Sequence, residues 1–391
     1  MMLTTLARAM TLVALAGVMT SGCGTLSNLI SREDNTLSPA PLPRLENARP
    51  IKTLWNRDAG AGVGKQHIML TPATDGERIF VSDHKGQVQA LSAKTGKTLW
   101  KTRTRAPISA GIGLGDGHAL VGGLDGQVLA LSVEDGTLAW QAAVSSEVLS
   151  VPSAADGKTI VRTVDGKLFA LDSLTGAQLW VYERPVPALT LRGTSSPLVV
   201  ANAAIVGLDS GRLAAISLTD GQPIWETPIS VPRGRSELER MVDLDAQPIV
   251  VDDILYVASF QGAVAAVDRF SGDLLWRRDL SSYAGLGADG QRLYVTDERS
   301  HIWAFDRHSH ASVWRQDALQ GRRLTAPVSF LDYVVVGDFE GYVHWLQRTD
   351  GKLVARTRVD RKGITAPPLL GIDTLYVYGQ GGKLAALQMG G

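Results

Sequence analysis

The sequence predicts an all-β fold, an eight-bladed β-propeller of four-stranded antiparallel blades whose ring is closed by the N-terminal strand. Three observations lead to this prediction. The chain of 391 residues contains a pattern that recurs about every 43 residues, each copy holds two glycine-bearing turns, and most copies end on a tryptophan. A period of this length, built from short alternating strands and tight turns, is typical of propeller blades.

The clearest copy of the repeat runs from Asp165-Gly166 through Ala170-Leu171-Asp172 and Thr175-Gly176 to Trp180. Two such turns between apolar strands indicate consecutive hairpins. The regular spacing of the closing tryptophans favours packing between blades over ligand binding, because each indole can bury about 150–250 Å². Seven copies carry this residue, as Trp55, Trp100, Trp140, Trp180, Trp225, Trp276 and Trp314, and in the copy near residue 350 the position holds Ala355.

The two ends of the chain predict how the ring closes. The eighth copy passes through Gly381-Gly382 and Ala386-Leu387 and stops before its last strand, while Ile51–Trp55 matches the closing strand of the other copies. We therefore expect the N-terminal strand to complete the eighth blade, which protects the sheet edges that an open ring would expose. A ring of seven blades is the alternative, and it would leave both of these segments unpaired.

The N-terminal residues predict export and lipid attachment. The apolar run of residues 10–19 is too short to span a membrane as a helix, and small residues lead from it to Cys23, the single cysteine of the chain. This arrangement resembles the lipobox of bacterial lipoproteins, although Thr20 stands where an aliphatic residue is usual. A plain signal peptide with an incidental cysteine is the alternative.

This interpretation divides the chain into three parts. Residues 1–22 are expected to be a lipoprotein signal peptide, residues 23–47 the lipidated N-terminus and a polar flexible tether, and residues 48–391 a single propeller. Cys23 is then the lipid anchor. Because Gly24 rather than Asp follows it, the start resembles that of lipoproteins sorted to the outer membrane, with the propeller facing the periplasm.

Composition excludes several functions. The 39 Lys and Arg residues balance 39 Asp and Glu residues, so the chain lacks the basic excess that nucleic-acid binding requires. We find no catalytic motif, no calcium loop and no phosphate-binding loop, and we predict no catalytic residue, no metal and no cofactor. His308 and His310 are close in sequence, but they are interpreted as part of a solvated turn, since metal sites usually need three or four ligands.

Longer strings carry a resemblance to a known family. The pattern Ala170-x-Asp172-x-x-Thr175-Gly176-x-x-x-Trp180 resembles the docking motif of propellers of the pyrroloquinoline quinone (PQQ) type. The stretches 189–193, 242–250 and 336–345, behind a lipobox, resemble the BamB family, lipoprotein subunits of the β-barrel assembly machinery (the BAM complex). The resemblance implies a non-catalytic scaffold that docks on the BamA-type subunit and supports insertion of β-barrel proteins into the outer membrane. Unfolded outer-membrane proteins are further candidate partners.

Two alternatives to this function stay open. One is a periplasmic PQQ-type propeller enzyme, although the chain is shorter than such enzymes and has no second cysteine for the disulfide they commonly carry. The other is a scaffold for a different envelope partner, which propeller geometry alone does not exclude.

The resemblance also points to a docking patch. The segments after Trp180 and Trp225 carry extra length, and the family strings occupy both. Antiparallel blades place all such segments on one face of the ring, so neighbouring blades should present them side by side. We therefore expect partner binding by Leu189, Leu191, Arg192, Asp243 and Asp245. The alternatives are a tolerated insertion and, for the two aspartates, capping of local turns.

Overall fold

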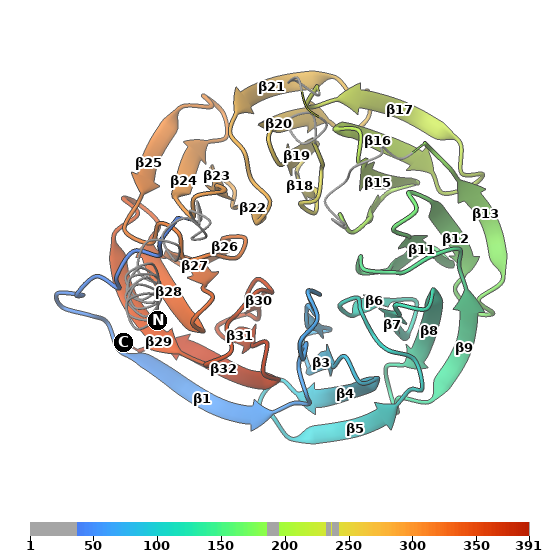
Figure 1. Ribbon diagram of the computed structural model, residues 1–391, viewed down its shortest axis with the longest axis horizontal. Coiled ribbons are helices and arrows are strands. Elements are labelled where there is room, and N and C mark those ends of the chain that lie inside the picture. Colours follow the sequence, from blue (N-terminus) through green and yellow to red (C-terminus); the bar gives the residue numbers. More distant parts are fainter. Residues whose placement is uncertain (1–36, 186–194, 232–235, 237–241, 391) are drawn as a thin grey trace, which may run out of the picture. The chain divides into compact units, whose positions relative to one another are not determined.

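Eight four-stranded antiparallel sheets form a closed ring (Figure 1). The computed structural model describes residues 37–185, 195–231, 236 and 242–390, and Pro39–Gly391 form one compact unit. Each sheet is one blade, with its first strand nearest the centre of the ring and its last strand at the rim (Figure 1). The predicted fold class, including eight blades rather than seven, is confirmed.

The strands follow the chain from the first blade to the eighth. Blades one to four consist of β2 (Ala73–Thr74), β3 (Arg78–Ser82), β4 (Gln87–Ser92), β5 (Thr98–Arg103); β6 (Gly113–Gly115), β7 (His118–Gly122), β8 (Gln127–Ser132), β9 (Leu138–Ala143); β10 (Ser153–Ala155), β11 (Lys158–Arg162), β12 (Leu168–Asp172), β13 (Gln178–Tyr182); and β14 (Leu198–Val200), β15 (Ala203–Gly207), β16 (Arg212–Ser217), β17 (Pro223–Pro228).

The remaining strands complete the ring. Blades five to eight consist of β18 (Ile249–Val251), β19 (Ile254–Ala258), β20 (Ala263–Asp268), β21 (Leu274–Asp279); β22 (Gly285–Ala288), β23 (Arg292–Thr296), β24 (Ile302–Asp306), β25 (Ser312–Gln316); β26 (Val328–Phe330), β27 (Tyr333–Gly337), β28 (Tyr342–Gln347), β29 (Leu353–Arg358); and β30 (Leu369–Leu370), β31 (Leu375–Tyr378), β32 (Lys383–Met389), β1 (Ile51–Asp58).

The two middle strands of each blade are buried on both faces because neighbouring blades cover them, so they read as continuous apolar runs. The outermost strands alternate instead. In β5, for example, Leu99 is 53% exposed while Trp100 beside it is 8% exposed. This pattern places the tryptophans between blades and leaves an aliphatic residue on the rim.

The N-terminal strand closes the ring as predicted. β1 pairs antiparallel with β32, from Ile51 opposite Met389 to Asp58 opposite Lys383, with a bulge between Thr53 and Trp55. The Lys383 ammonium also lies 2.6 Å from the Asp58 carboxylate. The eighth blade is therefore built from both ends of the propeller sequence.

Two faces of the ring need names. We call the segment from the outermost strand of one blade to the innermost strand of the next a crossing. Because the strands of a blade are antiparallel, all crossings lie at one end of the strands, together with the turns between second and third strands. We call this end the crossing face and the opposite end the turn face.

The tryptophans of the repeat lie on outermost strands and contact the turn of the following blade. Six of them donate a hydrogen bond from indole Nε1 to a backbone carbonyl in that turn, for example Trp140 to Ser173 at 2.7 Å. The same turn holds a glycine, Gly176, where an added Cβ would lie 2.7 Å from the Trp140 ring. Glycine is therefore required at this point both for its φ of +73° and for the close approach of the ring.

The interface between the fifth and sixth blades departs from this arrangement. His310 takes the place of the glycine, with φ of +60°, and its ring stacks on Trp276 with centroids 5.0 Å apart and planes 14° from parallel. Burial lowers the pKa of His310. This imidazole thus forms part of an interface between blades.

The interface between the seventh and eighth blades, here called the seam, explains the tryptophan missing at Ala355. In the other blades an alanine on the third strand pairs with the tryptophan of the outermost strand, as Ala130 does with Trp140. In the seventh blade the pair is inverted, with Trp345 opposite Ala355, and Trp345 is 1% exposed. The eighth blade has no turn between its last two strands to receive an indole, because the two ends of the propeller meet there.

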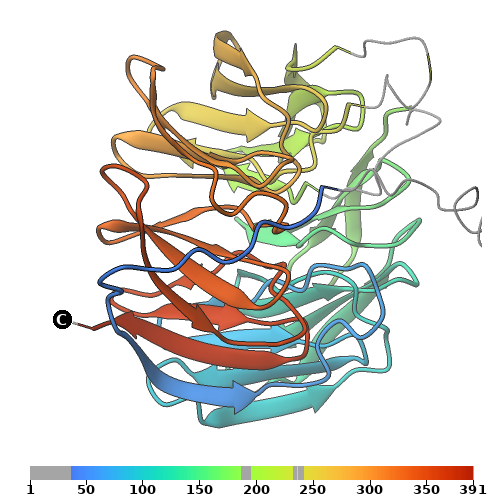
Figure 2. The same cartoon turned by 60° about the vertical axis from the view of Figure 1, so that its left-hand side comes forward.

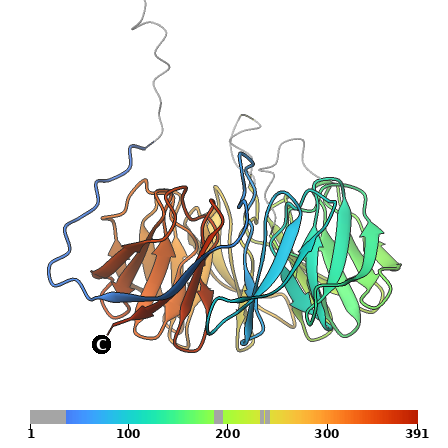
Figure 3. The same cartoon turned by 90° about the horizontal axis from the view of Figure 1, so that it is seen from below.

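Residues 39–50, here called the arm, lie along the outside of the seventh blade (Figures 2 and 3). Arg49 donates its backbone N–H to Val354, and the Arg356 guanidinium donates to the carbonyl of Pro43 at 3.2 Å. At the crossing face, Ala40 bonds to Gln320 and accepts a 3.0 Å bond from Arg322. The compact unit thus includes residues 39–47 of the predicted tether, while the signal peptide, the lipid anchor and the flexibility of the tether stay predictions.

Within the described part of the chain, no helix has both the length and the apolar character needed to cross a membrane.

Candidate docking surface

The two crossings predicted to bind a partner flank the fourth blade. One runs from β13 to β14 and the other from β17 to β18, so both lie on the crossing face. Leu189, Leu191 and Arg192 fall outside the described residues, and their role stays a prediction. Asp243 and Asp245 are described, in the second crossing.

A hydrogen bond joins the two crossings where both are described. The Ser195 hydroxyl, at the end of the first crossing, donates to the carbonyl of Ala246 at 3.2 Å, and Ser195 is fully buried. The expected proximity of the two crossings therefore holds for these residues.

Asp243 lies beneath the surface of the second crossing. It is 1% exposed, and its backbone carbonyl accepts a 2.9 Å bond from the N–H of Phe260, in the turn between β19 and β20. Leu244, also buried, approaches Gly207 so closely that an added Cβ there would lie 2.5 Å from the Leu244 carbonyl oxygen. Asp243 is thus part of the packing between the fourth and fifth blades, and any contact with a partner must reach a nearly inaccessible side chain.

Asp245 has a strongly perturbed carboxyl. Burial, together with the nearby charge of Asp243, raises its pKa to about 8 against the opposing effect of Arg162. One of its carboxylate oxygens is buried without a hydrogen-bond partner. A carboxyl in this setting is favoured in its protonated form near neutral pH.

Sequence reasoning missed two residues of this surface, Arg162 at the end of β11 and Asp209 in the turn between β15 and β16. They form a buried ion pair, with side chains 6% and 12% exposed. The aspartate in the corresponding turn of the seventh blade, Asp338, lies one position earlier, directly after β27, and accepts the backbone N–H groups of Glu340 and Tyr342 in its own turn. Comparison of the repeats gives a signal for Arg162, because its position is occupied by uncharged residues in the other blades, such as Gly122 and Gly207.

A cation and three carboxylates from three blades therefore meet on the crossing face: Arg162, Asp209, Asp243 and Asp245. Such an excess of negative charge, partly shielded from water, suits a cationic or hydrogen-bond-donating partner group. Among the described residues, no group of three or more His, Cys, Asp and Glu side chains is placed to hold a metal ion.

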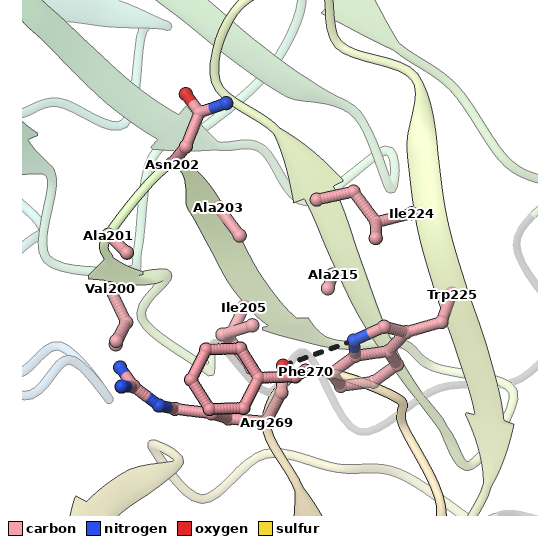
Figure 4. A pocket seen from close by; sticks show the side chains of 10 residues that line it. All are labelled: Val200, Ala201, Asn202, Ala203, Ile205, Ala215, Ile224, Trp225, Arg269 and Phe270. Atoms are coloured by element: carbon pink, nitrogen blue, oxygen red, sulfur yellow. Dashed lines mark hydrogen bonds between the residues drawn. The ribbon is translucent and has the colours of Figure 1, made fainter. Parts of the chain in front are cut away.

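An apolar pocket of about 230 Å³ lies on the opposite side, between the fourth blade and the turn of the fifth (Figure 4). Ile205, Ile224, Trp225 and Phe270 line it, and Phe270 is 63% exposed. Its one charged lining residue, Arg269, is already paired with Asp253 at 2.8 Å. The pocket is a gap beside the Trp225 contact and has few polar groups that could orient a ligand.

Comparisons with known proteins identify the family. The model of the family described as "Outer membrane protein assembly factor BamB" matches residues 47–112 and 84–316. A protein of that name from Pseudomonas aeruginosa is 50% identical over 356 residues, which cover 91% of this chain and 94% of the relative. The crystal structure of BamB from Moraxella catarrhalis superposes with a TM-score of 0.78 at 26% identity, covering 87% of this chain and all of that one.

Enzymes share only the architecture. Quinohemoprotein alcohol dehydrogenase from Comamonas testosteroni superposes with a TM-score of 0.71, covering 88% of this chain and 77% of that one, but at 14% identity this likeness shows the fold alone. Relatives that match along most of the chain, such as the one from Pseudomonas aeruginosa, are named assembly factors. The chain belongs to the BamB family of outer membrane protein assembly factors.

Proposed function

We propose that the protein is a non-catalytic scaffold of the β-barrel assembly machinery, held at the outer membrane by a lipid on Cys23 and docked on a BamA-type subunit. Membership of the BamB family supports the assembly role. The observation that supports the docking site is the convergence of two crossings, joined by Ser195 and Ala246, on the buried charges of Arg162, Asp209, Asp243 and Asp245.

Docking is tested by co-purification of the BamA-type subunit from detergent-solubilised envelopes. Arg192→Ala should weaken binding by about 2 kcal/mol or more, as expected for a buried interfacial arginine. It should leave thermal unfolding of the isolated propeller nearly unchanged. The Asp125→Ala variant is a matched control, because Asp125 is an exposed aspartate on the same face but in the second blade.

Asp243→Ala needs both measurements, since Asp243 is buried between blades. Lost co-purification with an equally large loss of stability assigns Asp243 to folding rather than to the interface. Normal co-purification by both the Arg192 and the Asp243 variants contradicts the proposed docking site.

The absence of catalysis is a separate part of the proposal. The purified protein, supplied with calcium and pyrroloquinoline quinone, should not reduce an artificial electron-accepting dye. Turnover with stoichiometric quinone would favour the enzyme alternative.

Lipid attachment is tested by metabolic labelling with a palmitate analogue in a bacterial host that processes lipoproteins. The wild-type chain should carry the label and the Cys23→Ser variant should not. Unlabelled wild-type protein would remove the anchor from the proposed function.

A further inference from the structure

Exposed basic residues are numerous on one part of the crossing face. The carboxylates of the candidate docking surface lie at blades three to five. Six basic residues lie at blades six to eight and at the crossing from the eighth blade to the first, although the chain as a whole has no net charge. These residues, here called the basic arc, are Lys65, Arg299, Arg323, Arg358, Arg361 and Lys362, and all are exposed.

The basic arc has few negative charges to balance it. No ion pair involves any of its six side chains within the described part of the chain; Arg358 donates only to the backbone carbonyl of Glu340, at 2.9 Å. Among the neighbouring acids Glu298 is exposed beside Arg299, whereas Asp338 and Asp360 are buried. Asp338 is buried beside Arg322 and His344, and Asp360 is 5% exposed and accepts a 2.7 Å bond from the N–H of Gly381.

The arm reaches the crossing face next to this arc. Arg322, 3% exposed, donates to the carbonyl of Ala40 and forms ion pairs with Asp338 and Glu340. Arg323 follows Arg322 directly, so the point where the arm meets the ring and the basic arc coincide. The stretch from Cys23 to Pro39 can span at most about 55 Å, which keeps this part of the ring within reach of whatever surface holds Cys23.

We infer that the basic arc is a second attachment surface, which binds the anionic headgroups of the phospholipid bilayer that holds the lipid anchor; this rests on the proposed lipidation of Cys23. A lipid anchor is strengthened by a nearby basic surface, because each cation close to an anionic bilayer adds to the attraction. An acidic segment of a partner protein has compatible charge, but the arm, which continues from the proposed anchor, contacts the ring at Arg322 beside the arc and therefore favours the membrane.

The inference is tested with the lipidated chain in vesicles that contain a headgroup-linked quencher. A dye on Thr365→Cys, exposed on the crossing face, reports approach to the bilayer, and a dye on Thr349→Cys, exposed on the turn face, is the control position. Cys23 is the chain's single natural cysteine and is blocked by its lipid, so labelling is specific. Quenching at residue 365 should be at least about twofold stronger with about 30% phosphatidylglycerol than with pure phosphatidylcholine, and should weaken at high salt.

Charge reversal supplies the matched comparison. Lys65→Glu/Arg361→Glu/Lys362→Glu should abolish the difference between the two vesicle types. Lys94→Glu/Lys97→Glu/Lys352→Glu, with the same change of charge at exposed positions of the turn face, should preserve it.

Any of five results overturns the inference. Equal quenching on both vesicle types, or equal effects of the two triple variants, removes the basic arc as a membrane surface. Normal quenching differences in the first triple variant together with lost BamA-type co-purification would assign the arc to a protein partner. If the wild-type chain does not bind vesicles, both the lipidation of Cys23 and the role of the basic arc are contradicted. If it binds vesicles but the dye at residue 365 is not quenched, only the role of the basic arc is contradicted.

Discussion

The interface between the second and third blades and the seam between the seventh and eighth solve the same packing problem differently. At the first, Trp140 reaches out from β9, packs its ring on Gly176 and donates to the carbonyl of Ser173. At the seam, β29 carries Ala355, and the indole lies one strand further in, as Trp345. The backbone N–H of Gly390 donates to the carbonyl of Pro50 where another blade would have a turn.

The difference shows that the docking tryptophan depends on the turn that receives it. A glycine turn provides both a flat surface for the ring and a carbonyl for Nε1. Two chain ends provide neither, and Trp345 accordingly has its Nε1 buried without a hydrogen-bond partner. At the seam the indole of Trp345 still fills the space between blades, but its Nε1 makes no hydrogen bond.

The largest effect is expected when the contact of Trp140 with the third blade is removed. Trp140→Ala should lower the free energy of unfolding by about 3–5 kcal/mol, because it leaves a cavity between blades and an unbonded carbonyl. Chemical denaturation measures this loss. Leu138→Ala, on the same strand but 52% exposed, should change stability by less than about 0.5 kcal/mol. Similar losses in the two variants would contradict the packing role of Trp140.

Placing the tryptophan of the repeat at position 355 of the seam should destabilise the protein. Ala355→Trp introduces an indole where no glycine turn receives it, so we expect a loss of about 1–3 kcal/mol in the free energy of unfolding. The double variant Trp345→Ala/Ala355→Trp should not recover wild-type stability. If the double variant is as stable as the wild type, the position of the indole does not depend on the turn.

The buried carboxyl of Asp245, at the second crossing, should make the stability of the protein depend on pH. Because the pKa of Asp245 is about 8 in the folded protein and about 4 when unfolded, the folded state binds an extra proton between these values. The contribution of Asp245 to the free energy of unfolding therefore falls as pH rises from about 4 to about 8. Asp245→Asn resembles the protonated form. The free energy of unfolding of this variant, relative to that of the wild type, should therefore rise over this range and exceed it by about 1–2 kcal/mol at pH 9.

Thermal unfolding at pH 5 and pH 9 measures this difference. Gln247→Ala is the control, because Gln247 is an exposed residue of the same crossing that does not titrate. A constant difference between the Asp245→Asn and wild-type proteins across pH would mean that Asp245 ionises normally.

The smallest expected effect concerns the turn in which histidine replaces glycine. His310→Gly loses the stack on Trp276 and relieves a left-handed backbone, so the two contributions oppose each other. We expect a change below about 1 kcal/mol in thermal stability at pH 8. A loss as large as that of Trp140→Ala would show that the imidazole is an essential part of this interface.

The repeat made the architecture predictable, since the spacing of the tryptophans and the orphan strand at residues 51–55 determine both blade number and closure. The inversion at Trp345 and Ala355 was not predicted, because it depends on which strands face the chain ends in space. The same holds for the ion pair of Arg162 with Asp209, whose residues lie in different blades. Sequence reasoning located the second crossing but could not foresee that Asp243 is buried within it.

Closure by β1 also has a consequence for biosynthesis. The contact between Asp58 and Lys383 joins residues 325 positions apart, so the first strand of the propeller to be made must wait for the last. Until then β1 has no partner, and its free edge is open to pairing with another chain, which makes exchange of this strand between copies the characteristic misassembly. The ring can therefore close only on a chain that contains both strands, because a protein lacking β32 has no pairing partner for β1.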